Sequence, residues 1–249
     1  MVRRWLAPRD RSAVVETDEA FRVLRSNINV ALNELEKPIV IITSAQPGEG
    51  KTMTTVNLGR AMALAGQRAI VVDVDLRHPD AHRQLGAHNE VGLTDVLLDR
   101  RPLDECLQFV EIGRGLSDTP RGLFFLGTGV GVGGPTELLA TGRMSRLLNS
   151  LASQADIVLL DAPPVLPVAD TLVIGRMAAG AVLVVEARRT PIDAVRQAKD
   201  ALTRNQTRLL GLVVNKLEAP DMMSSFGYGE GYGYRGDEIA SNGDSGSSG

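Results

Sequence analysis

The chain has 249 residues, of which 43% are hydrophobic and 23% are charged, and its formal net charge is −3. These values predict one large α/β domain, and the weak negative charge argues against a general nucleic-acid-binding protein, so we expect no nucleic-acid partner. The chain contains no run of about 18 apolar residues and no signal-peptide core, so we expect the protein to remain in the cytoplasm. Its single cysteine, Cys106, has no disulfide partner and is expected to be a small buried residue.

Residues 1–16 contain four arginines around Trp5 and show no sustained periodicity, which predicts a flexible basic arm. This arm is either solvated or rests on an anionic membrane surface or a membrane partner. A helix is predicted to follow, with Thr17 as its N-cap. Its apolar face is formed by Phe21, Leu24, Ile28, Ala31 and Leu35.

Residues 39–52, with the sequence IVIITSAQPGEGKT, predict a buried strand that leads into a phosphate-binding loop and then a helix over 51–64. Gly48 and Gly50 allow the backbone N–H groups to converge, Lys51 can reach the outer phosphates, and Thr52 can offer a hydroxyl to Mg²⁺. Ala45 replaces the first glycine of the usual loop pattern. The sequence therefore predicts ATP or GTP binding. The residues expected to bind the nucleotide are Gln46, Pro47, Gly48, Glu49, Gly50, Lys51, Thr52 and Met53.

Two further apolar runs end in acidic residues. The run over 68–74 leads to Asp73 and Asp75, whose i, i+2 spacing places both carboxylates on one side of a strand. The run over 155–161 ends at Asp161, which has the pattern of a Walker B acid that would hold Mg²⁺ opposite Thr52. Because the carboxyl ends of parallel strands form the ligand-binding edge, we expect these acids beside the phosphates.

Apolar runs over 181–185 and 209–214 alternate with predicted helices over 169–177 and 192–204. This alternation predicts a mainly parallel sheet with helices on both faces, within one domain over residues 17–219. Asn215 follows the last strand and either meets the base of the nucleotide or belongs to an ordinary turn.

The glycines at positions 129, 131 and 134 match a dinucleotide-binding pattern only formally. Neither an immediate helix nor an acidic residue about 20 positions later follows them, so a flexible loop before a helix over 136–139 is the expectation. The histidines are not at metal-ligand spacing and are expected to be polar loop residues. They are His78, His82 and His88.

Beyond Pro220 the composition becomes rich in glycine and serine, which predicts a disordered tail over residues 220–249. The tail holds all three tyrosines of the chain, Tyr228, Tyr232 and Tyr234. They are either phosphate acceptors or the contacts of an aromatic docking tail.

Taken together, these motifs resemble the cytoplasmic bacterial tyrosine kinases of the capsule and exopolysaccharide type. The match covers about residues 17–234 and includes the phosphate loop, VVDVDLRHP, IVLLDAPP and the tyrosine cluster. Glu19, Arg22 and Arg25 fit the oligomerisation motif of that family, although an isolated Glu–Arg pair on a helix is usually a weak surface contact. The related septum-site and partition ATPases carry a signature lysine that would fall at Gln46.

The resemblance implies a P-loop NTPase fold of the deviant Walker A superfamily, with ATP and Mg²⁺ as cofactors. It implies phosphoryl transfer to the tail of a neighbouring subunit in a homo-oligomer, with a ring as one arrangement, and then to other protein tyrosines. Lys51, Asp73, Asp75 and Asp161 would be catalytic, and Thr52, Asp73 and Asp161 would bind the metal. A membrane-bound activator would hold the kinase at the inner face of the plasma membrane, where it would control polysaccharide synthesis and export. The alternative function is a P-loop ATPase switch that positions a membrane complex without phosphorylating protein.

Overall fold

The structure is a computed structural model that describes residues 11–33, 35, 37–114, 118–131 and 133–217. The described residues up to Asn215 form one compact unit, and the second unit begins at Lys216. Only residues 216 and 217 of the second unit are described, so the predicted tyrosine tail lies outside the described residues. In the part of the chain that is described, no helix is both long enough and apolar enough to cross a bilayer.

A seven-stranded sheet forms the centre of the first unit, with the strand order β3-β4-β2-β5-β1-β6-β7. The strands are β1 (Ile39–Ser44), β2 (Ala69–Asp73), β3 (Leu107–Arg114), β4 (Pro120–Leu126), β5 (Ile157–Asp161), β6 (Gly180–Glu186) and β7 (Leu209–Asn215). All neighbouring strands are parallel except β3 and β4, which form an antiparallel pair at one edge. The predicted fold class, a mainly parallel α/β sheet, is confirmed.

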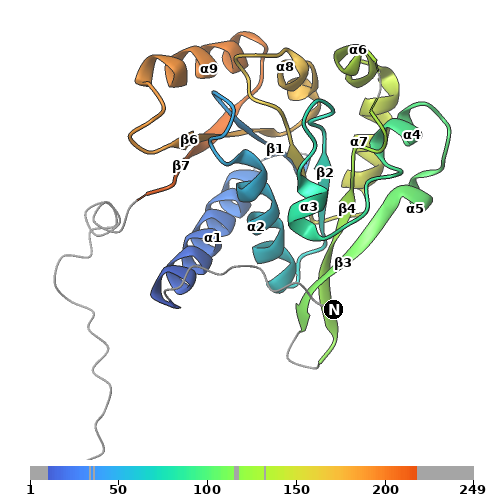
Figure 1. The fold of residues 1–249 in the computed structure, drawn as a ribbon, viewed down its shortest axis with the longest axis horizontal. Helices are drawn as coiled ribbons and strands as arrows, with labels where there is room; N and C mark the ends of the chain where they lie inside the picture. The colour runs from blue at the N-terminus through green and yellow to red at the C-terminus, as the bar shows by residue number, and fades with distance from the viewer. Residues whose placement is uncertain (1–10, 34, 36, 115–117, 132, 218–249) are drawn as a thin grey trace, which may run out of the picture. The chain divides into compact units, whose positions relative to one another are not determined.

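Helices cover both faces of this sheet, as Figure 1 shows. They are α1 (Arg11–Leu32), α2 (Lys51–Leu64), α3 (Ala81–Leu85), α4 (Leu93–Leu97), α5 (Leu103–Cys106), α6 (Pro135–Leu139), α7 (Gly142–Ala152), α8 (Asp170–Ile174), the 3₁₀ helix η1 (Gly175–Met177) and α9 (Ile192–Arg204). Helices α1 and α2 pack against each other on one face, and α7, α8 and α9 contribute to the core of the other.

The buried strands separate the two cores by the alternation of their side chains. In β1, Ile39 and Ile41 pack into the core with α7 and α9, whereas Val40 and Ile42 pack into the core with α1 and α2. Successive side chains of a strand point to opposite faces, so a strand covered on both sides must be apolar throughout. This explains why the central strands appear in the sequence as unbroken apolar runs. Cys106 is buried, as predicted.

The structure differs from the sequence predictions at the start of α1 and at one edge of the sheet. Helix α1 begins at Arg11, before the predicted N-cap Thr17, because nothing after Pro8 in the sequence prevents a helix. The sequence analysis also did not predict β3 and β4. Strand β3 lies at the sheet edge and alternates exposed and half-buried residues, so it lacks the continuous apolar pattern of the central strands.

Candidate functional site

The phosphate-binding loop lies between β1 and α2, at the carboxyl edge of the sheet. Gly48 and Gly50 have φ values of +84° and +97°, a left-handed conformation that glycine adopts without strain. Ala45 is fully buried and its φ is negative, so this position does not require the glycine of the usual pattern.

Asn215, at the end of β7, contacts the phosphate-binding loop. Its side-chain amide donates a hydrogen bond of 2.9 Å to the Glu49 carbonyl oxygen. A Cβ atom on Gly50 would lie only 2.0 Å from Asn215 Nδ2, so Gly50 is fixed by this contact as well as by its φ. The structure thus places the Asn215 side chain against the loop, and its contact with the base of a nucleotide stays a prediction.

The Glu49 side chain stabilises the conformation of the phosphate-binding loop through hydrogen bonds. Its side chain is buried, and its carboxylate accepts hydrogen bonds from the Gln46 backbone N–H at 2.9 Å and from the Thr190 hydroxyl. The Gln46 carbonyl oxygen in turn accepts a hydrogen bond from the Ser44 hydroxyl at 2.8 Å. These contacts fix the backbone of the loop before any ligand binds.

The predicted acids meet beside Lys51. Asp73 and Asp161 are register partners on the adjacent strands β2 and β5, and both are fully buried. Asp75 lies just beyond the end of β2, and its carboxylate is 2.8 Å from Lys51 Nζ. Lys51 Nζ is also 3.9 Å from Asp161 Oδ1. Asp75 is thus not on the strand as predicted, but the loop still brings all three acids together.

Asp73 and Asp75 have different surroundings. Both Asp73 oxygens accept backbone hydrogen bonds, from the N–H of Asp75 at 3.1 Å and of Ala81 at 3.3 Å. One Asp75 oxygen accepts the His78 backbone N–H at 3.0 Å, and the other pairs with Lys51. Asp75 lines a cavity with Lys51, whereas Asp73 is fully buried behind it.

The acid cluster contains more negative than positive charge. Burial raises the pKa of Asp161 to about 6, and burial together with the charge of Asp161 raises the pKa of Asp73 well above its ordinary value. Burial works to lower the pKa of Lys51, but the three neighbouring carboxylates outweigh it and the pKa is raised. One lysine therefore faces three buried acids, an arrangement that an additional cation would stabilise.

The residues present fit a magnesium ion. Asp161 Oδ2 is buried and, within the described residues, has no hydrogen-bond partner. The Thr52 hydroxyl accepts a hydrogen bond from Lys51 Nζ at 3.3 Å, which places it in the same cluster. Carboxylate and hydroxyl oxygens are the ligands that Mg²⁺ prefers. A hydrogen bond of 3.3 Å from the Thr55 hydroxyl orients the other Asp161 oxygen.

A cavity of about 390 Å³ opens over this cluster. The phosphate-binding loop and the start of α2 form one side, with Pro47, Lys51, Thr52 and Met53. An apolar wall forms another side, with Pro163, Pro164, Pro167 and Val168. The segment that follows β2 also lines the cavity, with Asp75, Arg77, His78, Asp80 and Gln84. The cavity thus joins the predicted phosphate-binding residues to a second, partly apolar surface.

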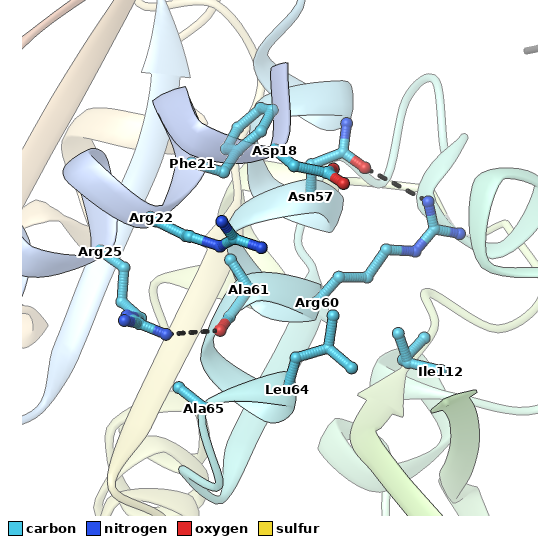
Figure 2. A pocket seen from close by; sticks show the side chains of 10 residues that line it. All are labelled: Asp18, Phe21, Arg22, Arg25, Asn57, Arg60, Ala61, Leu64, Ala65 and Ile112. Carbon is cyan, nitrogen blue, oxygen red and sulfur yellow. Dashed lines mark hydrogen bonds between the residues drawn. The ribbon is translucent and has the colours of Figure 1, made fainter. Parts of the chain in front are cut away.

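The three residues of the predicted oligomerisation motif lie on α1, away from this cavity. Arg22 donates to Glu19 at 3.0 Å within the helix, and both side chains are more than half exposed. Arg25 instead donates a hydrogen bond of 3.1 Å to the Ala61 carbonyl oxygen and so attaches α1 to α2. Figure 2 shows Arg22 and Arg25 at the wall of a pocket of about 370 Å³ between these helices.

The glycine-rich segment before α6 is a loop, as predicted, and Asn89 binds it through Thr128 and Gly129. The expectation that no helix follows the glycines at once is wrong, because α6 begins at Pro135, directly after Gly134. Among the described residues, no group of three or more His, Cys, Asp or Glu side chains is arranged to hold a metal ion. A magnesium ion held by Asp161 and Thr52 would therefore take its remaining ligands from phosphate oxygens and water, as Mg²⁺ commonly does at nucleotide sites.

Sequence reasoning assigned no role to Thr55, Arg77 or Asp170. Thr55 is one helical turn after Lys51, so the i, i+4 spacing on α2 was a signal that could have been used. Arg77 binds Asp170 through two hydrogen bonds across 93 positions of sequence, and no local pattern marks such a pair.

Comparison with known proteins agrees with this geometry. Residues 40–226 match the family model of the CobQ/CobB/MinD/ParA nucleotide-binding domain. The chain is 35% identical over 197 residues to the tyrosine-protein kinase YwqD of Bacillus subtilis. The aligned region covers 79% of this chain and 80% of YwqD. This chain belongs to the bacterial tyrosine kinases of that nucleotide-binding family.

Two further relatives define how far the match extends. The putative tyrosine-protein kinase EpsB of Ralstonia solanacearum is 32% identical over 86% of this chain, but the match spans only 27% of EpsB. The kinase domain of the Escherichia coli tyrosine kinase ETK superimposes with a TM-score of 0.72 at 28% identity, over 87% of this chain and 80% of that one. The family thus occurs both as chains of similar length and within longer proteins.

Proposed function

We propose that this protein is an ATP- and Mg²⁺-dependent protein-tyrosine kinase that phosphorylates Tyr228, Tyr232 and Tyr234 on the tail of a neighbouring subunit. The observation that carries the proposal is the buried cluster of Lys51, Asp75 and Asp161 directly beside the phosphate-binding loop. Membership of the tyrosine-kinase family gives the acceptor class.

The roles of the residues follow from their surroundings. Lys51 and the loop amides would bind the phosphates, while Thr52 and Asp161 would hold Mg²⁺, with Asp73 adding charge behind them. Bound Mg²⁺ neutralises charge that develops during phosphoryl transfer. The position of Gly50 against Asn215 would keep the loop amides directed at the phosphates.

Asp75 is the better candidate to orient the tyrosine hydroxyl, because it lines the cavity and Asp73 does not. When Lys51 turns toward the phosphates, it leaves Asp75 without its cation, and the free carboxylate can accept the hydroxyl proton late in the reaction. A tyrosine has an ordinary pKa near 10, so this acceptance is needed only as the oxygen–phosphorus bond forms.

Replacing Tyr228, Tyr232 and Tyr234 with phenylalanine together is expected to abolish self-labelling by labelled ATP, because phenylalanine has no hydroxyl to accept a phosphoryl group. Phosphotyrosine immunoblotting and mass spectrometry of the full chain measure the result. Undiminished labelling would contradict the assignment of the tail. Release of free phosphate by the unmodified chain without any phosphotyrosine would instead support the ATPase-switch alternative.

We also propose that Glu19 and Arg22 bind a second copy of the chain, while Arg25 holds α1 on α2. Both Glu19 and Arg22 are exposed and pair only with each other in the described part of the chain, so they can exchange partners at little cost. A Glu19→Ala change is expected to reduce the mass measured by light scattering. The matched control is Glu105→Ala, which removes an exposed pair with Arg101 at 2.9 Å. An unchanged mass for Glu19→Ala would remove this role.

The biological setting is proposed from the resemblance of the sequence motifs. We infer that the kinase controls capsular or extracellular polysaccharide synthesis and export, and that a membrane-bound activator holds it at the inner face of the plasma membrane. Deletion of the gene with no change in surface polysaccharide would contradict this setting.

A further inference from the structure

Arg77 is held in one orientation from two different helices. Its Nε and Nη2 atoms donate hydrogen bonds of 2.8 and 3.2 Å to the two oxygens of Asp170, at the first position of α8. Nη2 also donates to the Thr136 hydroxyl of α6 at 3.1 Å, and Thr136 itself donates to Asp170. Figure 1 shows α6 and α8 next to each other, and Arg77 bridges them to the segment after β2.

This arrangement is more rigid than an ordinary surface ion pair. The Asp170 side chain is fully buried, whereas that of Arg77 is 37% exposed. Burial works to raise the pKa of Asp170, but the hydrogen bonds from Arg77 and Thr136 outweigh it, and the pKa is lowered. A bidentate arginine–carboxylate pair has fixed geometry, so the guanidinium is already ordered before a ligand binds and loses little further conformational entropy on binding.

The rest of the guanidinium remains available. Within the described residues, no hydrogen bond is formed by Nη1, and Arg77 lines the same cavity as Lys51, Thr52 and Asp75. Asp75, which pairs with Lys51, also interacts electrostatically with Arg77. Arg77 and Lys51 therefore both lie near Asp75 in the lining of the same cavity.

We propose that Arg77 binds the terminal phosphate of the nucleotide, opposite Lys51, and that Asp170 and Thr136 are positioning residues for its guanidinium. The chemistry is that of a planar donor group recognising a phosphate through charge-assisted hydrogen bonds. The inference rests on the proposed binding of ATP, but it does not depend on phosphorylation of the tail.

Titration calorimetry of the full chain with Mg²⁺ and either ADP or a non-hydrolysable ATP analogue tests this contact without measuring activity. Arg77→Ala is expected to weaken binding of the analogue about 10-fold, as expected for loss of one hydrogen bond to a charged group, and to change ADP binding less than about twofold. Asp170→Asn should weaken the analogue in the same direction but less. Arg77→Lys should be intermediate, because lysine cannot bind Asp170 and a phosphate through one planar group.

Arg196→Ala is the matched control, since it removes an exposed arginine paired with Asp193 at 3.1 Å on α9, and it should change neither affinity. Equal weakening of ADP and the analogue, or no weakening of either, would overturn the proposal. If Arg77→Ala fails to fold, as its thermal unfolding will show, the same comparison is made with Arg77→Lys and Thr136→Val. A chain that binds the analogue as expected but makes no phosphotyrosine would refute the kinase assignment. The proposal that Arg77 binds the terminal phosphate would still hold.

Discussion

Replacing Lys51 with methionine is expected to lower phosphotyrosine formation by at least about 10³-fold, because the change removes the cation nearest the transferred group. It should also destabilise the protein by about 2–4 kcal/mol, since Asp75 and Asp161 are left buried without their positive partner. Kinase assays and urea unfolding measure the two effects. Lys199→Met, which changes an exposed lysine on α9, is the control and should alter neither.

A second substitution separates the two roles of Lys51. Adding Asp75→Asn to Lys51→Met removes the carboxylate that the missing ammonium group had neutralised at 2.8 Å. The double variant should therefore recover part of the stability, about 1–2 kcal/mol, and none of the activity. Additive losses of stability would show that the two side chains are not coupled in solution.

Asp161→Asn is expected to have opposite effects on activity and on stability. Phosphotyrosine formation should fall by at least about 10³-fold, because the amide cannot supply the carboxylate oxygen that would hold Mg²⁺. Without Mg²⁺, however, the variant should unfold at a temperature roughly 5 °C higher at pH 8, because it no longer buries a charge. Differential scanning calorimetry in the presence of a chelator measures this shift.

The stability of the unmodified protein is expected to fall as pH rises, because of Asp161. The pKa of Asp161 is raised by burial to about 6 in the folded protein, above its ordinary value of 3.8. The folded state therefore holds this proton more tightly than the unfolded state, and the resulting stability is complete below about pH 4 and is lost as pH rises through about 6. Asp161→Asn should flatten that decline between about pH 4 and 7. A decline that is unchanged in the variant would mean that other groups cause it.

The central strands and the phosphate-binding loop were predictable because their requirements are local. A strand covered on both faces must be apolar, as β1 and β5 are, and a loop that directs backbone amides at an anion needs left-handed residues such as Gly48 and Gly50. The carboxyl ends of neighbouring strands then bring Asp73 and Asp161 together without further information.

Edge strands and side-chain roles were less predictable. Strand β3 is half-exposed and pairs antiparallel to β4, so its residues carry no continuous apolar pattern. The different roles of Asp73 and Asp75 depend on backbone N–H groups of Asp75 and Ala81, which close on Asp73 only after the chain turns into α3. The sequence pattern likewise places Arg25 outside the apolar face of its helix and does not indicate its hydrogen bond to the Ala61 carbonyl oxygen of α2.

The sequence by itself determined that this chain builds a parallel α/β sheet with a phosphate-binding loop and three acids at one edge, because apolar runs, glycine conformations and strand polarity act over a few residues. Only the tertiary structure decided that Asn215 supports the loop at Glu49 and that Asp170 orients Arg77 toward the cavity. These contacts join positions separated by 166 and 93 residues, and their energy depends on burial and hydrogen-bond geometry that exist only once the sheet and helices have packed.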